Sequence, residues 1–367
     1  MIFVTGDTHG DMGRFSSHRF PFQRDLEKEN YVIVCGDFGV IWDVSAKSPD
    51  GLLTESEREK WWLDWLEKLP FTVLFVDGNH ENFDRLNQYP VELWNGGKVH
   101  KIRPKVIHLM RGQVFELEGK KIFTFGGARS HDISDGILEK DDPKLKEKIR
   151  ELNRHNALYR VNHVSWWRQE MPSKEEMEEG WNNLAKHRFK VDYIITHCCP
   201  ESVQALIDEQ LEDHNELMGY FDKIRNACGY EKWYFGHYHA NKTVSRKEVL
   251  LYHFIVKLGE NVRDYKPVPG KPRFELYQPV KVKSRVKEEE EEKIGLVLIR
   301  DAYGSYPASE EPSYDILMMW NETEVILSKH IGESLVEALS EEEISASREQ
   351  LSYIATHWGT LKVPERW

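Results

Sequence analysis

The sequence predicts an α/β protein in which two mixed β-sheets pack face to face between helices, followed by a small C-terminal α+β domain. Three observations support this prediction. Short apolar strands alternate with amphipathic helices over the first two-thirds of the 367-residue chain. Segments suited to a parallel sheet are interrupted by a predicted antiparallel meander, which favours two packed sheets. The composition changes after about residue 260, where prolines and charged residues become frequent.

Five apolar runs are expected to be buried strands, and each leads directly into polar residues. The runs cover residues 2–4, 31–35, 72–76, 191–196 and 232–235. Ligands of layered α/β proteins gather at the carboxyl ends of the strands. We therefore expect the polar residues that follow these runs to lie close together.

Other parts of the first two-thirds fit antiparallel strands. Residues 105–110, 113–118 and 120–125 are expected to form a meander with a turn at Glu118-Gly119. Residues 242–256 fit a final hairpin.

Three helices have recognisable starts. The sequence Thr54-Glu55-Ser56-Glu57 fits a capping box, which opens a helix with a tryptophan-rich face. Ser173 followed by Glu176 opens a second helix, which is expected to reach about Lys186. A third helix is expected over residues 200–211.

The C-terminal third predicts a boundary and an accessory domain. Residues 1–260 form the predicted main domain, and residues 261–293 a linker rich in proline and charge that includes a run of glutamates. Residues 294–367 are expected to contain three strands and then a helix opened by a capping box at Ser340 and Glu343. This domain is acidic, which suggests a protein partner for it.

Charge and composition limit the functional classes. The net charge of −12 falls almost entirely beyond residue 286, so residues 1–286 together are nearly neutral and extended nucleic-acid binding is not expected. No apolar run approaches the ~20 residues of a membrane span, and no signal peptide is recognised. The four cysteines fit neither a zinc pattern nor a disulfide framework, so we expect a cytoplasmic protein.

Five short blocks of metal-binding residue types follow the five predicted strands. They are Gly6-Asp7-Thr8-His9-Gly10, Gly36-Asp37, Gly78-Asn79-His80-Glu81, Thr196-His197 and Gly236-His237-Tyr238-His239. Each block alone has an ordinary explanation, since an aspartate often caps a turn and a single histidine is often part of a core. All five together predict a dinuclear metal site that could activate water against a phosphate ester.

On these five blocks the chain resembles the calcineurin-like metallophosphoesterase superfamily, over roughly its first 255 residues. The resemblance implies an α/β/β/α sandwich that hydrolyses phosphate monoesters or diesters with a metal-activated hydroxide. It also implies the ligands, three for each ion and one for both. One ion is assigned Asp7, His9 and His239, the other Asn79, His197 and His237, and Asp37 bridges the two.

His80 has a different implied role. It would not bind metal but would act on the phosphate, by stabilising charge in the transition state or by protonating the leaving oxygen. Glu81 and Asp77 are nearby candidates for orienting the imidazoles. Oxygen and imidazole ligands without thiolate suit two divalent ions, with Mn²⁺ as first choice and Fe, Zn or Mg as alternatives.

The chain departs from one branch of the superfamily. Serine/threonine protein phosphatases follow their second block with Asp-Arg-Gly, whereas Asp37 is followed here by Phe38 and Gly39. We therefore do not expect protein phosphatase activity. The final Gly-His-x-His resembles the phosphodiesterase and nuclease branches.

Substrate residues and alternatives remain open at this point. Arg129 and His131 are candidates for substrate binding, and the insertion of residues 131–190, with Trp166-Trp167, fits either a lid or core packing. The expected substrate is a phosphorylated small molecule or a nucleotide. The alternatives are a nuclease of the same fold, and a phosphate-reading binding module whose acidic C-terminal domain is the interacting part.

Overall fold

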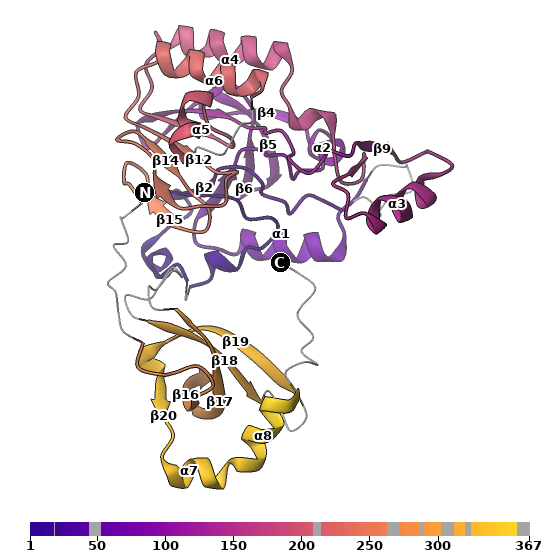
Figure 1. The fold of residues 1–367 in the computed structure, drawn as a ribbon. Coiled ribbons are helices and arrows are strands. Elements are labelled where there is room, and N and C mark those ends of the chain that lie inside the picture. The colour runs from indigo at the N-terminus through magenta and orange to yellow at the C-terminus, as the bar shows by residue number, and fades with distance from the viewer. Residues whose placement is uncertain are drawn as a thin grey trace. The chain divides into compact units, whose positions relative to one another are not determined.

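In the computed structural model the chain forms two compact units, Met1–Asp264 and Tyr265–Trp367 (Figure 1). The structure describes residues 1–17, 19–43, 53–207, 214–262, 272–286, 289–301, 312–319 and 324–357. Each unit has its own sheet or sheets and its own buried cluster of apolar side chains.

The first unit contains a seven-stranded mixed sheet with the order β15-β1-β2-β3-β6-β5-β4. Its four central strands are parallel: β1 (Ile2–Thr5), β2 (Tyr31–Val34), β3 (Thr72–Phe75) and β6 (Val106–Leu109). Antiparallel strands flank them: β15 (Ile255–Lys257), β5 (Gly97–Arg103) and β4 (Val91–Trp94).

The same unit contains a six-stranded mixed sheet with the order β13-β14-β12-β11-β8-β7. Four of its strands are parallel: β8 (Lys120–Phe125), β11 (Tyr193–Thr196), β12 (Lys232–Phe235) and β14 (Glu248–Leu250). The antiparallel edges are β7 (Gln113–Leu117) and β13 (Lys242–Thr243). Both sheets are therefore mixed, as predicted.

The strands alternate between two cores, which shows how the sheets pack. Ile33 of β2 and Ile195 of β11 belong to one buried cluster, which lies between the sheets. Val32 and Val34 face the other way, into a cluster with helix α1 (Glu57–Glu67). Because successive side chains of a strand point to opposite faces, this alternation places helices outside both sheets.

Helices α4 (Lys174–Lys186) and α6 (Glu216–Ala227) cover the outer face of the second sheet (Figure 1). Leu184 of α4 and Phe221 of α6 are buried in one cluster with Ile194 of β11. The predicted sandwich of two mixed sheets between helices is confirmed.

Two predicted antiparallel arrangements hold only in part: β7 pairs with β8 and β13 with β14 as expected, but the first segment of the meander and the end of the hairpin pair elsewhere. β6 pairs with β3 and β5 in the first sheet, while β7 and β8 form a hairpin in the second, so residues 105–125 are not one meander. All four residues of β6 are buried, as is usual for a strand covered on both faces, and such a run does not reveal its sheet. Likewise β13 pairs with β14, but β15 crosses to pair with β1.

The predicted helix starts hold with one shift. Ser173 caps α4 in a capping box with Glu176, as expected. The cap of α1 is Ser56 with Glu59, two residues after the predicted box at Thr54. Helix α5 covers Glu201–Ile207, and the rest of that prediction lies outside the described residues.

The insertion of residues 131–190 adds a small layer of its own. It contains a two-stranded parallel sheet of β9 (Ile137–Glu139) and β10 (Arg160–Asn162), helix α3 (Leu145–Arg154) and the turn η3 (Arg168–Glu170). The remaining short elements of the first unit are η1 (Gly13–Phe15), η2 (Pro21–Asp25) and α2 (Phe83–Leu86). Trp167 is fully buried and packs into the first core, so it is a core residue.

The second unit is an antiparallel five-stranded sheet with the order β19-β18-β17-β16-β20. The strands are β16 (Pro279–Val286), β17 (Glu289–Asp301), β18 (Ser313–Met319), β19 (Val325–Gly332) and β20 (Val336–Ala338). The turn η4 (Glu333–Leu335) and helices α7 (Glu341–Ala346) and α8 (Arg348–His357) complete it. Ser340 and Glu343 form the predicted capping box.

The predicted linker of residues 261–293 is wrong from Pro279 onward. Pro279 opens β16, a position that a proline can take because it lacks only one ladder donor. Val280 and Val282 alternate into the core of this unit, while the charged residues between them hide the pattern in the sequence. Within the part of the chain that is described, no helix is long and apolar enough to cross a membrane.

Candidate metal centre

The carboxyl ends of five parallel strands bring the candidate ligands to one place. Strands β1, β2 and β3 of the first sheet and β11 and β12 of the second each end within three residues of the start of one block. The seven expected ligands that follow them are Asp7, His9, Asp37, Asn79, His197, His237 and His239. The two sheets therefore contribute to the same site from opposite sides.

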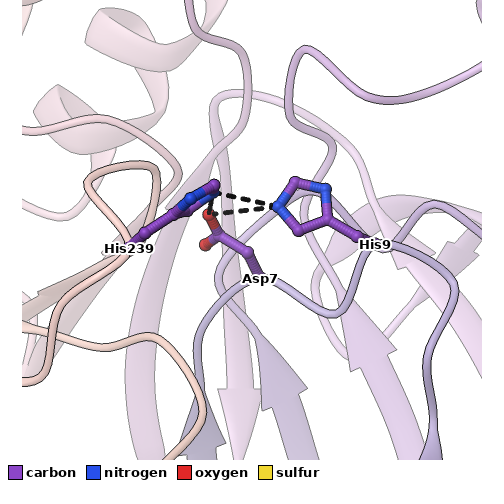
Figure 2. A group of neighbouring side chains, drawn as sticks. All are labelled: Asp7, His9 and His239. Atoms are coloured by element: carbon purple, nitrogen blue, oxygen red, sulfur yellow. Dashed lines mark hydrogen bonds and ion pairs between the residues drawn. The ribbon is translucent and has the colours of Figure 1, made fainter. Parts of the chain in front are cut away.

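Asp7, His9 and His239 form the first group (Figure 2). Nε2 of His239 lies 3.3 Å from Oδ2 of Asp7 and 3.0 Å from Nε2 of His9. Figure 2 shows the two imidazoles approaching the carboxylate from opposite sides. The side chain of Asp7 is buried, whereas those of His9 and His239 are 30% and 53% exposed, so this side of the site is open to solvent.

Asp37 lies between this group and a second one. Its Oδ2 is 3.8 Å from Nδ1 of His9, and its Oδ1 is 3.2 Å from Nε2 of His197. The backbone N–H of His80 also donates to Oδ1, at 2.8 Å. A buried carboxylate with one oxygen toward each group has the placement that a bridging ligand needs.

The second group contains Asn79, His197 and His237. Oδ1 of Asn79 lies 3.3 Å from Nε2 of His197, and the ring centroids of His197 and His237 are 5.0 Å apart. Nδ1–H of His197 donates to the carbonyl of Cys35 at 2.8 Å. That hydrogen bond turns Nε2 toward the site, as a metal-binding imidazole requires.

The glycines before the ligands make room for ligands from other strands. A Cβ at Gly36 would lie 2.2 Å from Nδ1 of His197, and one at Gly78 would lie 2.1 Å from Oδ1 of Asp37. A Cβ at Gly236 would lie 2.0 Å from Oδ1 of Asp7. No other residue type fits these three positions, so the glycines of the blocks are part of the site.

Several ligands have an uncommon backbone conformation. His9, Asp37, His237 and His239 have φ values of 46°, 45°, 71° and 47°, in the left-handed region that residues other than glycine rarely adopt. Such conformations cost free energy and persist where the surrounding structure enforces them, often at functional sites.

Two of the candidate ligands have the protonation state that suits a cation. Burial alone would raise the pKa of Asp37, but His197, His80 and His9 outweigh it and hold that pKa well below its usual range. Burial, together with the neighbouring His197 and His131, keeps the pKa of His237 well below 6.5. The carboxylate is thus ionised and His237 is neutral, which are the forms that bind metal.

His80 also lies at the site. One ring nitrogen of His80 lies within 4.8 Å of a ring nitrogen of His9 and of a carboxylate oxygen of Asp37. Its ring centroid is 4.9 Å from that of His9 and 5.8 Å from that of Trp42. The side chain reaches the same space as the ligands, and its role remains a prediction.

The expectation that Glu81 and Asp77 orient the imidazoles of the ligands is wrong, because both carboxylates bind other groups. Glu81 accepts from the backbone N–H of Phe38, at 2.7 Å, and so supports the loop after Asp37. Asp77 binds Arg111 and His108 instead of a candidate ligand. The group that orients the ring of His197 is the backbone carbonyl of Cys35. Every residue type has such a carbonyl, so the sequence does not indicate this contact.

A series of hydrogen bonds that the sequence did not predict orients the side-chain amide of Asn79. Nδ2 of Asn79 donates to Oγ of Ser130 at 3.4 Å, and both the N–H and the hydroxyl of Ser130 donate to the carboxylate of Glu170, at 3.0 and 2.6 Å. Because Nδ2 is engaged, Oδ1 of Asn79 is left to face His197. Glu170 is 40 residues from Ser130, in the insertion, and nothing local marks it.

The two candidate substrate residues have different surroundings. Arg129 is exposed, and its role stays a prediction. His131 is also exposed, but its Nε2 lies 2.8 Å from Nε2 of the expected ligand His237.

Comparison with known proteins agrees with this geometry. A family model described as calcineurin-like phosphoesterase matches residues 1–240. Lariat debranching enzyme of Danio rerio is 20% identical over 207 residues, covering 55% of this chain and 31% of that protein. Lariat debranching enzyme A of Xenopus laevis is 23% identical over 154 residues, covering 41% of this chain and 27% of that protein. The chain thus matches less than a third of the length of each relative.

Proposed function

The chain belongs to the calcineurin-like phosphoesterase family, and we propose that it is a metal-dependent phosphoester hydrolase that works through a dinuclear centre. The observation that supports this proposal most directly is the position of Asp37, whose two carboxylate oxygens face the two ligand groups. One ion would be held by Asp7, His9 and His239, and the other by Asn79, His197 and His237, with Asp37 shared. Mn²⁺ is our first choice, and Fe, Zn and Mg are alternatives.

The donor set fits such ions on its own chemistry. It consists of two buried carboxylates, one amide oxygen held toward the site, and imidazoles, with no thiolate. When bound, two divalent ions would supply an activated water and neutralise charge on the phosphoryl group. The protein keeps the ligand positions fixed through the strand ends and the glycine contacts.

His80 is the residue to which we assign the proton and charge chemistry. Burial is the main cause that lowers the pKa of His80, so the free ring is neutral and its N–H can donate a hydrogen bond to a phosphoryl oxygen. To protonate the leaving oxygen, the ring would first take up a proton and act as the imidazolium. The ring is placed by its backbone hydrogen bond to Asp37 and by contact with Trp42. Arg129 is proposed as a further substrate contact.

We propose a phosphorylated small molecule or nucleotide as substrate. Residues 1–260 contain 42 acidic and 36 basic residues, and this net negative charge does not suit a long nucleic-acid track. The second candidate is a nuclease of the same fold, favoured by the two relatives named for debranching a lariat. All four cysteines are buried as thiols, which suits a cytoplasmic location.

The test is turnover on a monoester, a diester, a 2′,3′-cyclic nucleotide and a branched RNA, each with Mn²⁺, Mg²⁺, Zn²⁺ and Fe²⁺. Metal-dependent turnover on a small ester supports the proposal, and turnover on branched RNA alone supports the nuclease. If the protein binds metal stoichiometrically but hydrolyses none of these esters, the result supports the remaining alternative. That alternative is a phosphate-reading binding module whose acidic C-terminal domain is the interacting part.

A further inference from the structure

One histidine outside the seven expected ligands is placed as a ligand would be. Nε2 of His131 lies 2.8 Å from Nε2 of His237, and the two ring centroids are 4.8 Å apart. His131 comes from the start of the insertion of residues 131–190, whereas His237 follows β12. The contact therefore joins the insertion to the candidate metal centre.

The geometry of His131 and His237 resembles that of His9 and His239, which are assigned to the same ion. His9 and His239 have Nε2 atoms 3.0 Å apart and ring centroids 5.0 Å apart. Two imidazole nitrogens that each lie about 2.1 Å from one ion, at about a right angle, are separated by roughly 3 Å. The separation of His131 and His237 falls in that range.

The residues on both sides of His131 are anchored, although its own side chain is exposed. Ser130 donates twice to the buried carboxylate of Glu170. Asp132 accepts from Nε of Arg160 at 2.8 Å and forms an ion pair with the other end of the same guanidinium at 2.6 Å. Ser130, His131 and Asp132 thus contact Asn79, His237 and Arg160 in turn, and the backbone that carries His131 is fixed in place.

We propose that His131 is an additional ligand of the ion held by Asn79, His197 and His237. The proposal rests on the dinuclear centre proposed above and deepens it. The other explanation is a hydrogen bond between the two rings. That bond would occupy a lone pair on His237 or His131 that faces the site, and would compete with metal.

The extra imidazole has a consequence for metal preference. The second ion would have three imidazoles, the Asn79 amide and a share of Asp37, whereas the first would have two imidazoles and Asp7 with its share of Asp37. Imidazole suits Zn, Fe and similar borderline ions, while Mg prefers oxygen and water. The second position is therefore expected to discriminate against Mg²⁺ more strongly than the first.

The test compares metal binding by the full chain and by the variants His131→Ala and His131→Gln. Each protein is stripped of metal, titrated with Mn²⁺ or Co²⁺ by calorimetry, and its metal content is measured after dialysis. His155→Ala is the matched control, because His155 is exposed at the end of α3 and lies in none of the ligand groups. Circular dichroism checks that each variant is folded.

We expect the second ion to bind about 10-fold more weakly or worse in both His131 variants, while the first is retained. The visible spectrum of the Co²⁺ protein should also change, since a nitrogen donor is lost. If the His131 variants bind two Mn²⁺ or Co²⁺ ions with unchanged affinity and an unchanged Co²⁺ spectrum, the proposal is overturned. A fall in turnover would then place His131 on the substrate, and unchanged turnover would give it no role at the site. Failure of the wild type itself to bind two ions is a different result and contradicts the dinuclear centre.

Discussion

Oδ1 of Asp37 lies 3.2 Å from Nε2 of His197. The first residue follows a strand of one sheet and the second follows a strand of the other. The contact therefore exists only because the two sheets pack with their parallel strands ending on the same side. The second carboxylate oxygen of Asp37 faces His9, and this arrangement underlies the predictions on metal binding.

Asp37→Asn should lower the occupancy of both metal positions. An amide has no negative charge and offers only one oxygen, so it cannot serve two ions. Metal content per chain, measured after dialysis, should fall at both positions, while the surface control Asp64→Asn should keep both ions. Loss of only one ion would show that Asp37 does not bridge.

His80→Ala should keep both ions and reduce kcat by roughly 10²–10⁴-fold, as is typical for loss of a proton donor or acceptor. The loss should be smaller for esters with very acidic leaving groups, because those leave without a proton. Parallel assays of an aryl ester with a nitro group and an alkyl ester measure this difference. Loss of metal in the variant would instead make His80 a ligand.

Metal binding should release protons near neutral pH. Burial lowers the pKa of His197, but Asp37, Asp7 and the Cys35 carbonyl outweigh it and raise the pKa to about 9. The free protein thus carries a proton on His197 at pH 7.5 that a metal must displace. Calorimetry in two buffers with different ionisation enthalpies should show net release, and affinity should rise with pH up to about 9.

The same shift predicts the stability of the metal-free protein. The pKa of His197 is higher in the folded state than its usual 6.5, so the stabilisation is complete below pH 6.5 and is lost as pH rises through about 9. Melting in the presence of a chelator should show this decline. A metal-free protein that gains stability over that range, or releases no proton on binding metal, contradicts the assignment.

Glu170→Gln should weaken the second metal position without unfolding the chain. The glutamate accepts from both donors of Ser130, whereas glutamine has only one accepting oxygen, so one buried donor loses its partner. The amide of Asn79 is then less well held, and affinity for the second ion should fall by about 10-fold. Glu178→Gln on the exposed side of α4 is the control. Unchanged metal affinity would mean that the link to Asn79 has no role in binding.

A chain that ends at Asp264 should fold, bind both ions and retain turnover on a small ester. The three core clusters of the first unit lie entirely before this residue, and the second unit has a separate core. A folded but inactive fragment would show that the acidic unit contributes to the site. With turnover retained, the acidic unit is accessory, and we propose that it binds a protein partner.

The sequence predicted the elements whose signals are local. Each of the strands before the ligand blocks is an apolar run that leads into polar residues within a few positions, so β1 and β12 could be placed almost to the residue. The cap of α1 was misplaced because Thr54 and Ser56 both stand three residues before a glutamate, and the local pattern does not choose between them. The sheet of β6 was missed because four buried residues fit either sheet.

The rest of the site depends on contacts between distant segments. Ser130 lies between the candidate substrate residues Arg129 and His131, but its partner Glu170 resembles any other acidic residue of a polar stretch. His131 was considered for substrate binding, and only the structure places it against His237. Such pairs are created when the insertion folds onto the strand ends, and no periodicity along the chain records them.

The central claim is a dinuclear centre that hydrolyses phosphate esters, and titration of the metal-free protein with Mn²⁺ tests it most directly. Hydrolysis of one small ester and bound metal should be measured in the same samples. We predict that turnover reaches its maximum at two equivalents of metal per chain and that a chelator abolishes it. Saturation at one equivalent, or two bound ions with no turnover, would contradict the account.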